Sequence, residues 1–330
     1  MTIDKKNLPD LSALQIDEKE LMEGYIPPDQ GSLAKYPTAD QIVFETPVNI
    51  PTESLNVKGK VIADKMETYL SDTGHFQSST CKSILKSPLH FAYAKDYEHK
   101  DLMEKLRKDN SHFNLGNYLH ACVLEPTKFS RILTAPTASR SSHAGCDTLI
   151  SWWEQQIQVV EGIEIPEPML QAFQNSDQKL PAKKIYIDNL ITLSSFQAMS
   201  ENDRIVCTIA KANFDRYENG LLHKILKHSK REISCYVTEP EFGLDVKVRP
   251  DAIQFSENIG VNAIISVKTT RHESVDAFAR HAATLDYHFS EGMYQKVVSQ
   301  ATGRKFNTTL MIMIQTVAPF GVALLKWSPE

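Results

Sequence analysis

The sequence predicts a fold that mixes α-helices and β-strands, and paired β-rich runs are the first indication of it. Residues 244–248 and 263–268 are short runs rich in β-branched residues, and they flank a turn-like segment at residues 256–260. Two such runs around a turn predict a β-hairpin. Nearer the end of the chain, the apolar run 308–314 is followed by residues 318–325, which we expect to be its hairpin partner. We therefore expect at least two pairs of strands.

Helical patterns supply the other half of this prediction. Apolar residues recur at helical spacing through residues 191–226, with an interruption at Asn219-Gly220. Residues 78–86 begin with capping serines, and Pro88 is typical of the first turn of a second helix that extends to residue 97. Residues 183–187 indicate a strand that leads into a helix. Helices and strands are thus expected to be interleaved along the chain.

Length and composition are those of an ordinary globular protein. The 330 residues are 42% hydrophobic and 23% charged, enough to bury a sizeable core. Frequent prolines in residues 1–65 break most candidate helices, so we expect a partly irregular N-terminal extension before one domain at residues 66–330. The net charge of −5 gives no overall basic character, so any nucleic-acid surface has to be a local patch.

The chain shows no signal for a membrane or for secretion. Its first twenty residues contain no long apolar run, and no segment reaches the roughly 18 consecutive apolar residues of a membrane span. We therefore expect a cytoplasmic protein.

Cysteine spacing gives little support for a metal site built from thiolates. The chain has five cysteines, and the closest pair, Cys122 and Cys146, is 24 positions apart (146 − 122). Zinc knuckles and iron–sulfur clusters use cysteines about two to four residues apart. We expect reduced, buried thiols, and neither zinc nor an iron–sulfur cluster.

Charged residues in the β-rich runs indicate a polar site. Alternation of side chains along residues 244–251 places four charged residues on one face of that strand, namely Asp245, Lys247, Arg249 and Asp251. In the second run Ser266 and Lys268 share a face, so Asp251 can lie opposite Lys268. A lysine held in a sheet is costly unless anions surround it. The two runs therefore predict a cluster of opposite charges.

This arrangement resembles the PD-(D/E)XK nuclease superfamily. Pro250-Asp251 matches the Pro-Asp that ends one strand, and Ser266-Val267-Lys268 stands where the acidic-x-Lys element is expected. The lysine is present, but the acid is a serine. The resemblance implies a restriction-endonuclease-like core, in which helices flank a central mixed β-sheet.

Further motifs resemble the exonuclease VIII-like branch of that superfamily. Gly116, His120 and Leu124-Glu125-Pro126 match its Gly-x-x-x-His-x-x-x-Leu-Glu-Pro signature, and the serines that precede residues 85–88 resemble its first helical motif. Gln295 matches a glutamine on a later helix. The branch has an insertion comparable to residues 131–195, which we expect to be helical and part of the same domain.

The resemblance implies a function and its residues. The chain would be a metal-dependent exonuclease that hydrolyses phosphodiester bonds at linear double-stranded DNA ends, as in phage recombination, with Mg²⁺ or Mn²⁺. The implied catalytic residues are Lys268, Asp251 and Gln295. The implied metal ligands are His120, Glu232, Asp251, the Val267 carbonyl and the degenerate position Ser266. The implied DNA contacts are Lys82, Lys86, Arg249, Thr269, Thr270 and Lys296. A homo-oligomer and an annealing recombinase as partner are implied as well.

Ser266 leaves three outcomes open. A serine hydroxyl is a poor ligand for Mg²⁺, and loss of a ligand commonly weakens metal binding. The site can be active but weakened, another acid such as Asp245 or Glu273 can take the vacant place, or the chain can be an inactive DNA-binding or protein-interaction module. A structural protein with buried ion pairs explains Asp251 and Lys268 but not the ordered set of motifs.

Overall fold

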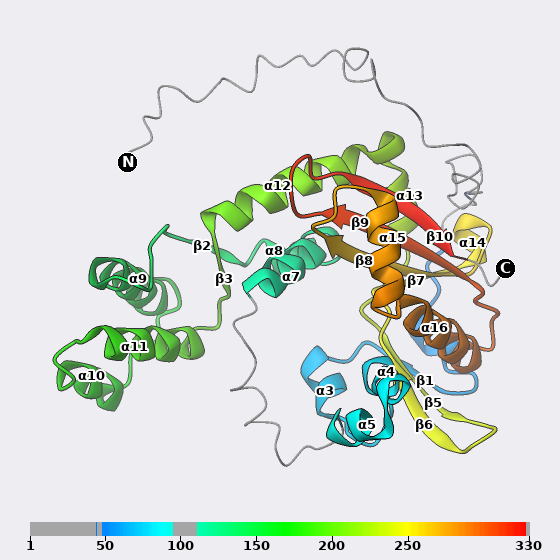
Figure 1. The fold of residues 1–330 in the computed structure, drawn as a ribbon, viewed down its shortest axis with the longest axis horizontal. Coiled ribbons are helices and arrows are strands. Elements are labelled where there is room, and N and C mark those ends of the chain that lie inside the picture. The colour runs from blue at the N-terminus through cyan, green and yellow to red at the C-terminus, as the bar shows by residue number, and fades with distance from the viewer. Residues whose placement is uncertain (1–43, 45–47, 95–110, 328–330) are drawn as a thin grey trace. The chain divides into compact units, whose positions relative to one another are not determined.

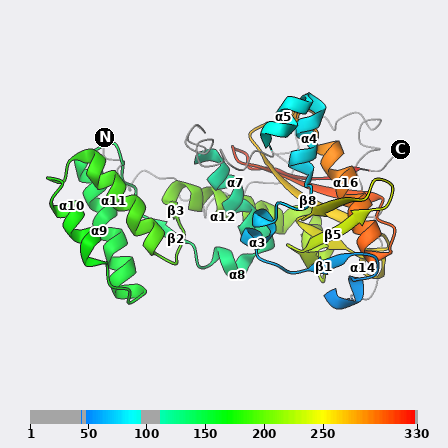
Figure 2. The same ribbon diagram turned by 90° about the horizontal axis from the view of Figure 1, so that it is seen from below.

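The computed structural model describes residue 44 and residues 48–94 and 111–327 of the chain (Figures 1 and 2). Within these ranges helices and strands are interleaved, and the largest sheet contains both parallel and antiparallel pairs. The mixed α/β class predicted from the sequence is confirmed at this level. No helix in the described ranges is long and apolar enough to cross a membrane.

A five-stranded sheet with the order β10-β9-β8-β7-β4 lies at the centre of the described fold. Its strands are β4 (Lys230–Arg231), β7 (Ala252–Gln254), β8 (Ala263–Thr270), β9 (Thr308–Gln315) and β10 (Val322–Trp327). Strands β8 and β9 are parallel, with Ser266 opposite Met311 and Lys268 opposite Met313, and the other neighbours are antiparallel. The hairpin predicted from residues 308–325 is confirmed as β9 and β10.

Strands β4 to β7 form one long antiparallel hairpin that passes from this sheet into a second one. Strands β5 (Ser234–Glu239) and β6 (Leu244–Val248) form a three-stranded sheet with β1 (Lys60–Ile62). Cys235 pairs with Val248, and Arg231 pairs with Ala252, so one register continues through the interruption between the two sheets. The two arms of the hairpin therefore keep the same pairing register on both sides of the bend.

The predicted pairing of residues 244–248 with residues 263–268 is wrong. Strand β6 pairs with β5, while β8 pairs with the short strand β7. The turn at residues 256–260 contains α14 (Ser256–Ile259) and joins β7 to β8. Strand β6 ends at Val248, before Arg249 and Pro250, and a separate strand starts after Asp251. The sequence pattern did not reveal this second strand because it has only three residues.

The charged strand face predicted for residues 245–251 is only partly present. Asp245 is exposed, but Lys247 is 1% exposed. Its Nζ atom donates hydrogen bonds to the carbonyl oxygens of Tyr69, at 2.5 Å, and Asp72, on and just after α3 (Met66–Ser71). Carbonyl oxygens thus satisfy this ammonium group inside the fold.

Part of the predicted N-terminal extension belongs to the folded body. Strand β1 pairs with β5, and Leu55, in the short helix η4 (Thr52–Leu55), and Val61 are both 1% exposed. These side chains pack in a core cluster with Cys235 and Val298. The fold therefore includes residues before position 65.

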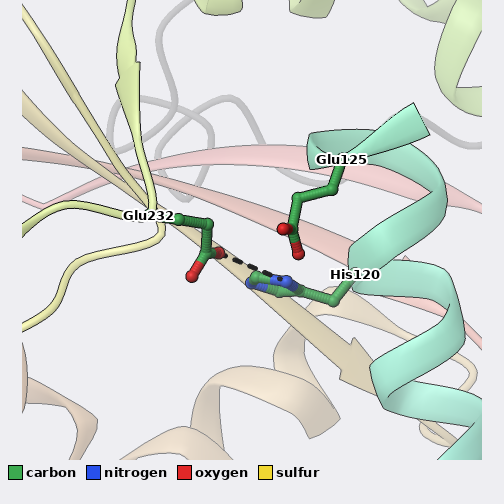
Figure 3. A group of neighbouring side chains, drawn as sticks. All are labelled: His120, Glu125 and Glu232. Carbon is green, nitrogen blue, oxygen red and sulfur yellow. Dashed lines mark ion pairs between the residues drawn. The ribbon is translucent and has the colours of Figure 1, made fainter. Parts of the chain in front are cut away.

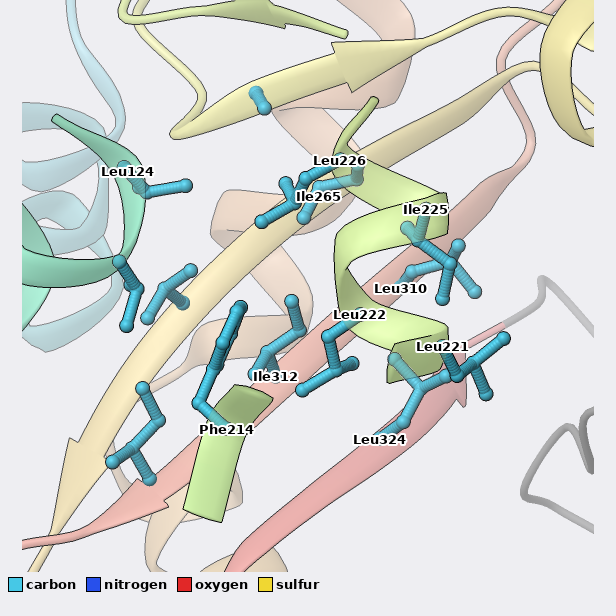
Figure 4. Close-up of a cluster of buried hydrophobic side chains, with 14 of the residues drawn as sticks. Leu124, Phe214, Leu221, Leu222, Ile225, Leu226, Ile265, Leu310, Ile312 and Leu324 are labelled. Carbon is cyan, nitrogen blue, oxygen red and sulfur yellow. The ribbon is translucent and has the colours of Figure 1, made fainter. Parts of the chain in front are cut away.

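Helices α7 (Ser111–Leu124), α12 (Glu201–Arg216) and α13 (Leu221–Leu226) cover one face of the five-stranded sheet. Figure 4 shows their apolar side chains packed on β8 and β9. The Ser200 hydroxyl caps α12 by accepting a hydrogen bond from the Asp203 amide. The predicted interruption at Asn219-Gly220 is confirmed in η6 (Tyr217–Gly220), where Gly220 has a φ of 81°.

Helix α16 (Tyr287–Thr302) packs on the opposite face of β8 and also on β5 and β6. It follows α15 (Val275–Thr284) and ends at Gly303, whose φ of 68° suits glycine. Helix α4 (Ser78–Lys86) packs on α16 and leads into α5 (Pro88–Ala94). The predicted pair of helices is confirmed as far as residue 94, and residues 95–97 lie outside the described ranges.

Residues 131–195 form a helical group, as predicted. After α8 (Pro126–Phe129), the group contains β2 (Leu133–Ala135), α9 (His143–Gln155), η5 (Gln156–Val160), α10 (Glu167–Gln174) and α11 (Leu180–Leu193). It has a core cluster of its own, and strand β3 (Ala198–Ser200) pairs in parallel with β2 where the chain returns to α12. Figures 1 and 2 both draw α9 to α11 beyond the first turn of α12.

The strand predicted at residues 183–187 is wrong, because these residues lie in α11. The buried side chains Lys183, Tyr186, Ile187 and Leu190 recur at a spacing of three and four. That is the period of a helix with one buried face.

Candidate metal centre

The candidate site lies where the long hairpin bends. Glu232 and Asp251 lie within the interruption of the two arms, at residues 232–233 and 249–251, and the Glu232 amide donates a hydrogen bond to the Asp251 carbonyl at 3.1 Å. Glu232 has a φ of 52°, a left-handed conformation that is uncommon for a residue other than glycine. Backbone strain of this kind is concentrated at functional sites. The fold thus holds two acidic residues side by side through backbone pairing.

Asp251 is the centre of the cluster. Its Oδ1 atom lies 3.1 Å from Nε2 of His120, and its Oδ2 atom lies 3.7 Å from Nζ of Lys268. Oδ2 also accepts a hydrogen bond from the Val267 amide at 2.6 Å. Burial raises the pKa of the Asp251 carboxyl, but Lys268, His120 and the Val267 amide outweigh burial and hold this pKa far below its usual range.

His120 lies between two carboxylates. Its Nδ1 atom is 3.6 Å from Oε1 of Glu232, on the side of the ring opposite Asp251. Burial lowers the pKa of the imidazole, but the hydrogen bond and charge of Asp251 and the charge of Glu232 raise it overall. One helical turn earlier, a Cβ atom on Gly116 would lie 3.0 Å from Oγ1 of Thr269. The absence of a side chain at Gly116 lets α7 approach β8 closely enough to bring His120 to the hairpin bend.

Glu125 joins this cluster from the end of α7. Ligand atoms of His120, Glu125 and Glu232 all lie within 4.8 Å of one another. Figure 3 shows the Glu125 carboxylate and the His120 ring projecting from α7 towards Glu232. The sequence motif contained Glu125, but we did not assign it as a ligand. Its position five residues after His120, at the end of the same helix, was the available signal.

One oxygen of this cluster lacks a hydrogen bond. The Oε1 atom of Glu232 is buried and has no hydrogen-bond donor in the described part of the chain. Burial raises the pKa of the Glu232 carboxyl, and the charge of His120 lowers it only in part. A buried carboxylate oxygen without a donor is costly unless a cation contacts it. The orphaned oxygen is therefore suited to a metal ion.

Ser266 contacts an acid that sequence reasoning missed. The Ser266 hydroxyl lies 2.9 Å from Oε1 and 2.8 Å from Oε2 of Glu291, which is on α16 and only 2% exposed. The two acids weighed from the sequence have other surroundings. Asp245 accepts a hydrogen bond from Thr238 at 2.6 Å in the three-stranded sheet, and Glu273 is an exposed residue between β8 and α15.

Lys268 is surrounded by anionic and aromatic groups. Its Nζ atom lies 5.6 Å from the centre of the Tyr287 ring, in addition to its contact with Asp251. Lys82, from α4, lies 5.5 Å from the same ring and donates a hydrogen bond to the Leu285 carbonyl at 2.8 Å. Burial lowers the pKa of the Lys268 ammonium, but Asp251 and Glu291 raise it overall. Lys268 is therefore positively charged at neutral pH.

Three residues predicted for catalysis or DNA contact have side chains that are already engaged inside the fold. The Gln295 side chain donates a hydrogen bond to the Thr309 hydroxyl at 3.1 Å. Thr309 pairs with Ile264 on β8, and Ile264 precedes Lys268 by four residues, which is about 13 Å along a strand. The Arg249 side chain is 8% exposed and contacts Asp64 at 2.8 Å and Glu232 at 3.3 Å. Thr270 is buried. These positions do not suit the predicted roles, because each side chain is already used inside the fold.

The other predicted DNA contacts are at or near the surface. Lys86 is exposed, and Lys296 is exposed with a 3.2 Å ion pair to Glu239. Thr269 is half-buried beside Gly116, and Lys82 is half-buried beside Tyr287. The charge of Lys82 interacts with those of Asp286, Lys268 and Glu291, and Thr269 is the neighbour of Lys268 in the chain.

Comparisons with known proteins do not identify a family. No protein-family model matches the chain, and no curated protein matches it either. A solved structure described as the crystal structure of SSO0001 aligns over 55% of this chain and 76% of its own, with 13% identity and a TM-score of 0.22. At that score the alignment supports no conclusion about fold or function.

Proposed function

We propose that the protein is a metal-dependent deoxyribonuclease with a restriction-endonuclease-like core, acting on the ends of linear double-stranded DNA. One observation carries the proposal. His120, Glu232, Asp251 and Lys268 come from α7, the two arms of the hairpin bend and β8, and they meet in one cluster. The sequence resemblance named these four residues independently of their positions in space.

The cluster fits a divalent cation. Glu232 contributes a buried oxygen without a hydrogen bond, and Glu125, Asp251 and His120 add further oxygen and nitrogen donors. Carboxylates suit Mg²⁺ and Mn²⁺, and an imidazole favours Mn²⁺ among these two. The Val267 carbonyl remains a predicted ligand. When bound, the ion would neutralise phosphoryl oxygens and support attack by water.

The chain itself would position the reactants. Asp251 holds Lys268 in place through Oδ2, so the Lys268 ammonium can orient a water molecule or stabilise charge that develops on the phosphate. His120 holds the other oxygen of Asp251. The exposed Lys86 offers positive charge to the DNA backbone at some distance from this centre.

Degradation of DNA by the purified full chain tests this proposal. Linear double-stranded DNA is incubated with the protein and Mg²⁺ or Mn²⁺. Closed circular DNA of the same sequence is the control, because it has no ends and should stay intact. Loss of activity in Lys268→Ala supports the proposal. A wild-type protein that binds the metal but leaves linear DNA intact would contradict it.

A non-catalytic DNA-binding or protein-interaction module is the second candidate. It is favoured by Ser266, which supplies no carboxylate, and by the contacts of Asp251 with His120 and Lys268, which satisfy its charge without a metal. Binding of linear DNA without cleavage, unchanged by chelator, would support this candidate. An annealing recombinase as partner and a homo-oligomer remain predictions of the resemblance for either candidate.

A further inference from the structure

Glu291 is a buried carboxylate with few partners. It is 2% exposed, and within the described part of the chain its hydrogen bond comes from the Ser266 hydroxyl, which has a single hydrogen to share between the two carboxylate oxygens. An ionised carboxylate accepts about four hydrogen bonds. Burial of such a group with one donor is costly unless positive charge lies nearby.

Positive charge at this position comes from within the site. Lys268 interacts electrostatically with both Asp251 and Glu291. Asp251 contacts the Val267 amide, while Glu291 contacts the hydroxyl of the preceding residue, Ser266. The two carboxylates therefore contact adjoining residues of β8, Asp251 from the hairpin and Glu291 from α16, and both interact with the charge of Lys268.

One lysine does not balance two carboxylates. The charge of Asp251 repels that of Glu291, and Lys82 as well as Lys268 attracts the Glu291 carboxylate. Replacement of a carboxylate by serine on β8 makes room for an acid from the neighbouring helix, because the small hydroxyl both vacates volume and donates a hydrogen bond. Ser266 is fully buried, so its hydroxyl meets Glu291 inside the fold.

We propose that Glu291 supplies the carboxylate that position 266 lacks, and that Ser266 holds Glu291 towards the metal centre. In this arrangement the acid is on helix α16 instead of strand β8, and its charge still interacts with Lys268. This inference rests on the proposed function for the identity of the cation. It assigns to the chain a metal-binding residue outside the predicted ligand set.

Metal binding by the full-length protein tests this inference directly. Isothermal titration with Mn²⁺ compares the wild type with Glu291→Gln, which keeps a hydrogen-bond acceptor for Ser266 but loses the charge. We expect Glu291→Gln to weaken Mn²⁺ binding about tenfold or more. The matched control is Glu273→Gln, which removes an exposed acid after β8 and is expected to bind Mn²⁺ as the wild type does.

A swap of the two residues is the stronger test. The double variant Ser266→Asp/Glu291→Ser returns the carboxylate to β8 and removes it from α16. We expect it to recover Mn²⁺ binding to within a few-fold of the wild type. Wild-type affinity in Glu291→Gln, or a folded swap variant without Mn²⁺ binding, would overturn the inference. If Glu291→Gln does not fold, the swap variant decides alone.

DNA degradation by the same variants separates the two proposals. If Mn²⁺ binding depends on Glu291 but no protein cleaves DNA, the metal-binding inference stands and the nuclease proposal fails. If the wild type cleaves DNA and Glu291→Gln binds metal and cleaves equally well, the nuclease proposal stands and the role of Glu291 is refuted.

Discussion

The Nε2 atom of His120 lies 3.1 Å from Oδ1 of Asp251, so helix α7 and the bend of the hairpin meet at one ring nitrogen. The other ring nitrogen faces Glu232. A protonated imidazole at this position offsets the repulsion between the two carboxylates. In the proposed metal site a divalent cation would do the same with more charge, so it would compete with the proton of His120 for the same pair of acids.

Replacement of Asp251 by asparagine should separate charge from shape. An asparagine has nearly the same shape as an aspartate. Its amide oxygen can still accept the hydrogen bond from the Val267 amide, but it offers no negative charge to a cation. We expect Asp251→Asn to weaken Mn²⁺ binding at least about tenfold and to abolish DNA cleavage. Calorimetric titration and a DNA degradation assay measure the two effects. Unchanged metal binding in a folded variant would exclude Asp251 as a ligand.

Replacement of Lys268 should affect cleavage but not metal binding. The Lys268 ammonium lies 3.7 Å from Asp251 and repels a cation bound there. We therefore expect Lys268→Ala to bind Mn²⁺ as tightly as the wild type or more tightly, while DNA cleavage is lost. Titration of the variant with Mn²⁺ checks this. Weaker metal binding would contradict this prediction and would mean that Lys268 maintains the arrangement of the metal ligands.

Two helical glycines form a matched pair for the approach of α7 to β8. A Cβ atom at Gly292 in α16 meets nothing within 4 Å, whereas one at Gly116 lies 3.0 Å from Thr269 Oγ1. Gly292→Ala should stabilise the protein by about 0.5–1 kcal/mol through helix propensity. Gly116→Ala should lose this gain to the close contact and weaken Mn²⁺ binding at His120. Urea unfolding compares them, and equal stabilisation by both would contradict the close approach.

Arg249 should matter for stability more than for DNA. Its side chain is 8% exposed, and its guanidinium is paired with Asp64 and Glu232. Arg249→Gln removes the cation paired with the buried Asp64 carboxylate and one of the partners of Glu232, so we expect a loss of about 3 kcal/mol in the free energy of unfolding. Lys86→Ala, at an exposed position, is the control and should leave stability unchanged. Equal stability of both variants would restore Arg249 as a candidate DNA contact.

Glu161 should make the helical group sensitive to acid. Its carboxylate accepts hydrogen bonds from the Ser194 hydroxyl, the Ser195 hydroxyl and the Ser195 amide. Burial raises the pKa of the Glu161 carboxyl, but these hydrogen bonds lower it below the ordinary value of 4.5. A lowered pKa in the folded state stabilises the protein above pH 4.5, and this stabilisation is lost as the pH falls through the lower folded-state value. Glu161→Gln should therefore cost about 1 kcal/mol at pH 7 and progressively less in acid. Urea unfolding at several pH values measures this, and a deficit that does not change with pH would contradict it.

Local patterns predicted many of the elements. The β9–β10 hairpin, helices α4 and α5, and the break between α12 and α13 follow from apolar spacing, capping serines and an Asn-Gly pair. The strand predicted at residues 183–187 was wrong because a run of five residues is too short to distinguish the periodicity of a helix from that of a strand. Their helical spacing becomes evident only when Leu190 is included.

Residues of the candidate site could be predicted where a local sequence motif places them on one helix or strand. His120, Glu232, Asp251 and Lys268 meet as expected. Glu291 was not predictable, because its approach to Ser266 depends on how α16 packs across β8. Gln295 was misplaced for the same reason, since it lies one turn farther along that helix and contacts Thr309.

The unbroken register of the long hairpin has a consequence for chain length. Glu232 and Asp251 are joined by a backbone hydrogen bond at the bend, whereas the turn at residues 240–243 lies at the far end of β5 and β6. Residues inserted in that turn would extend the hairpin or its loop without altering the distance between the two acids. The turn is therefore the natural attachment point for a fused tag or reporter that leaves the acidic cluster intact.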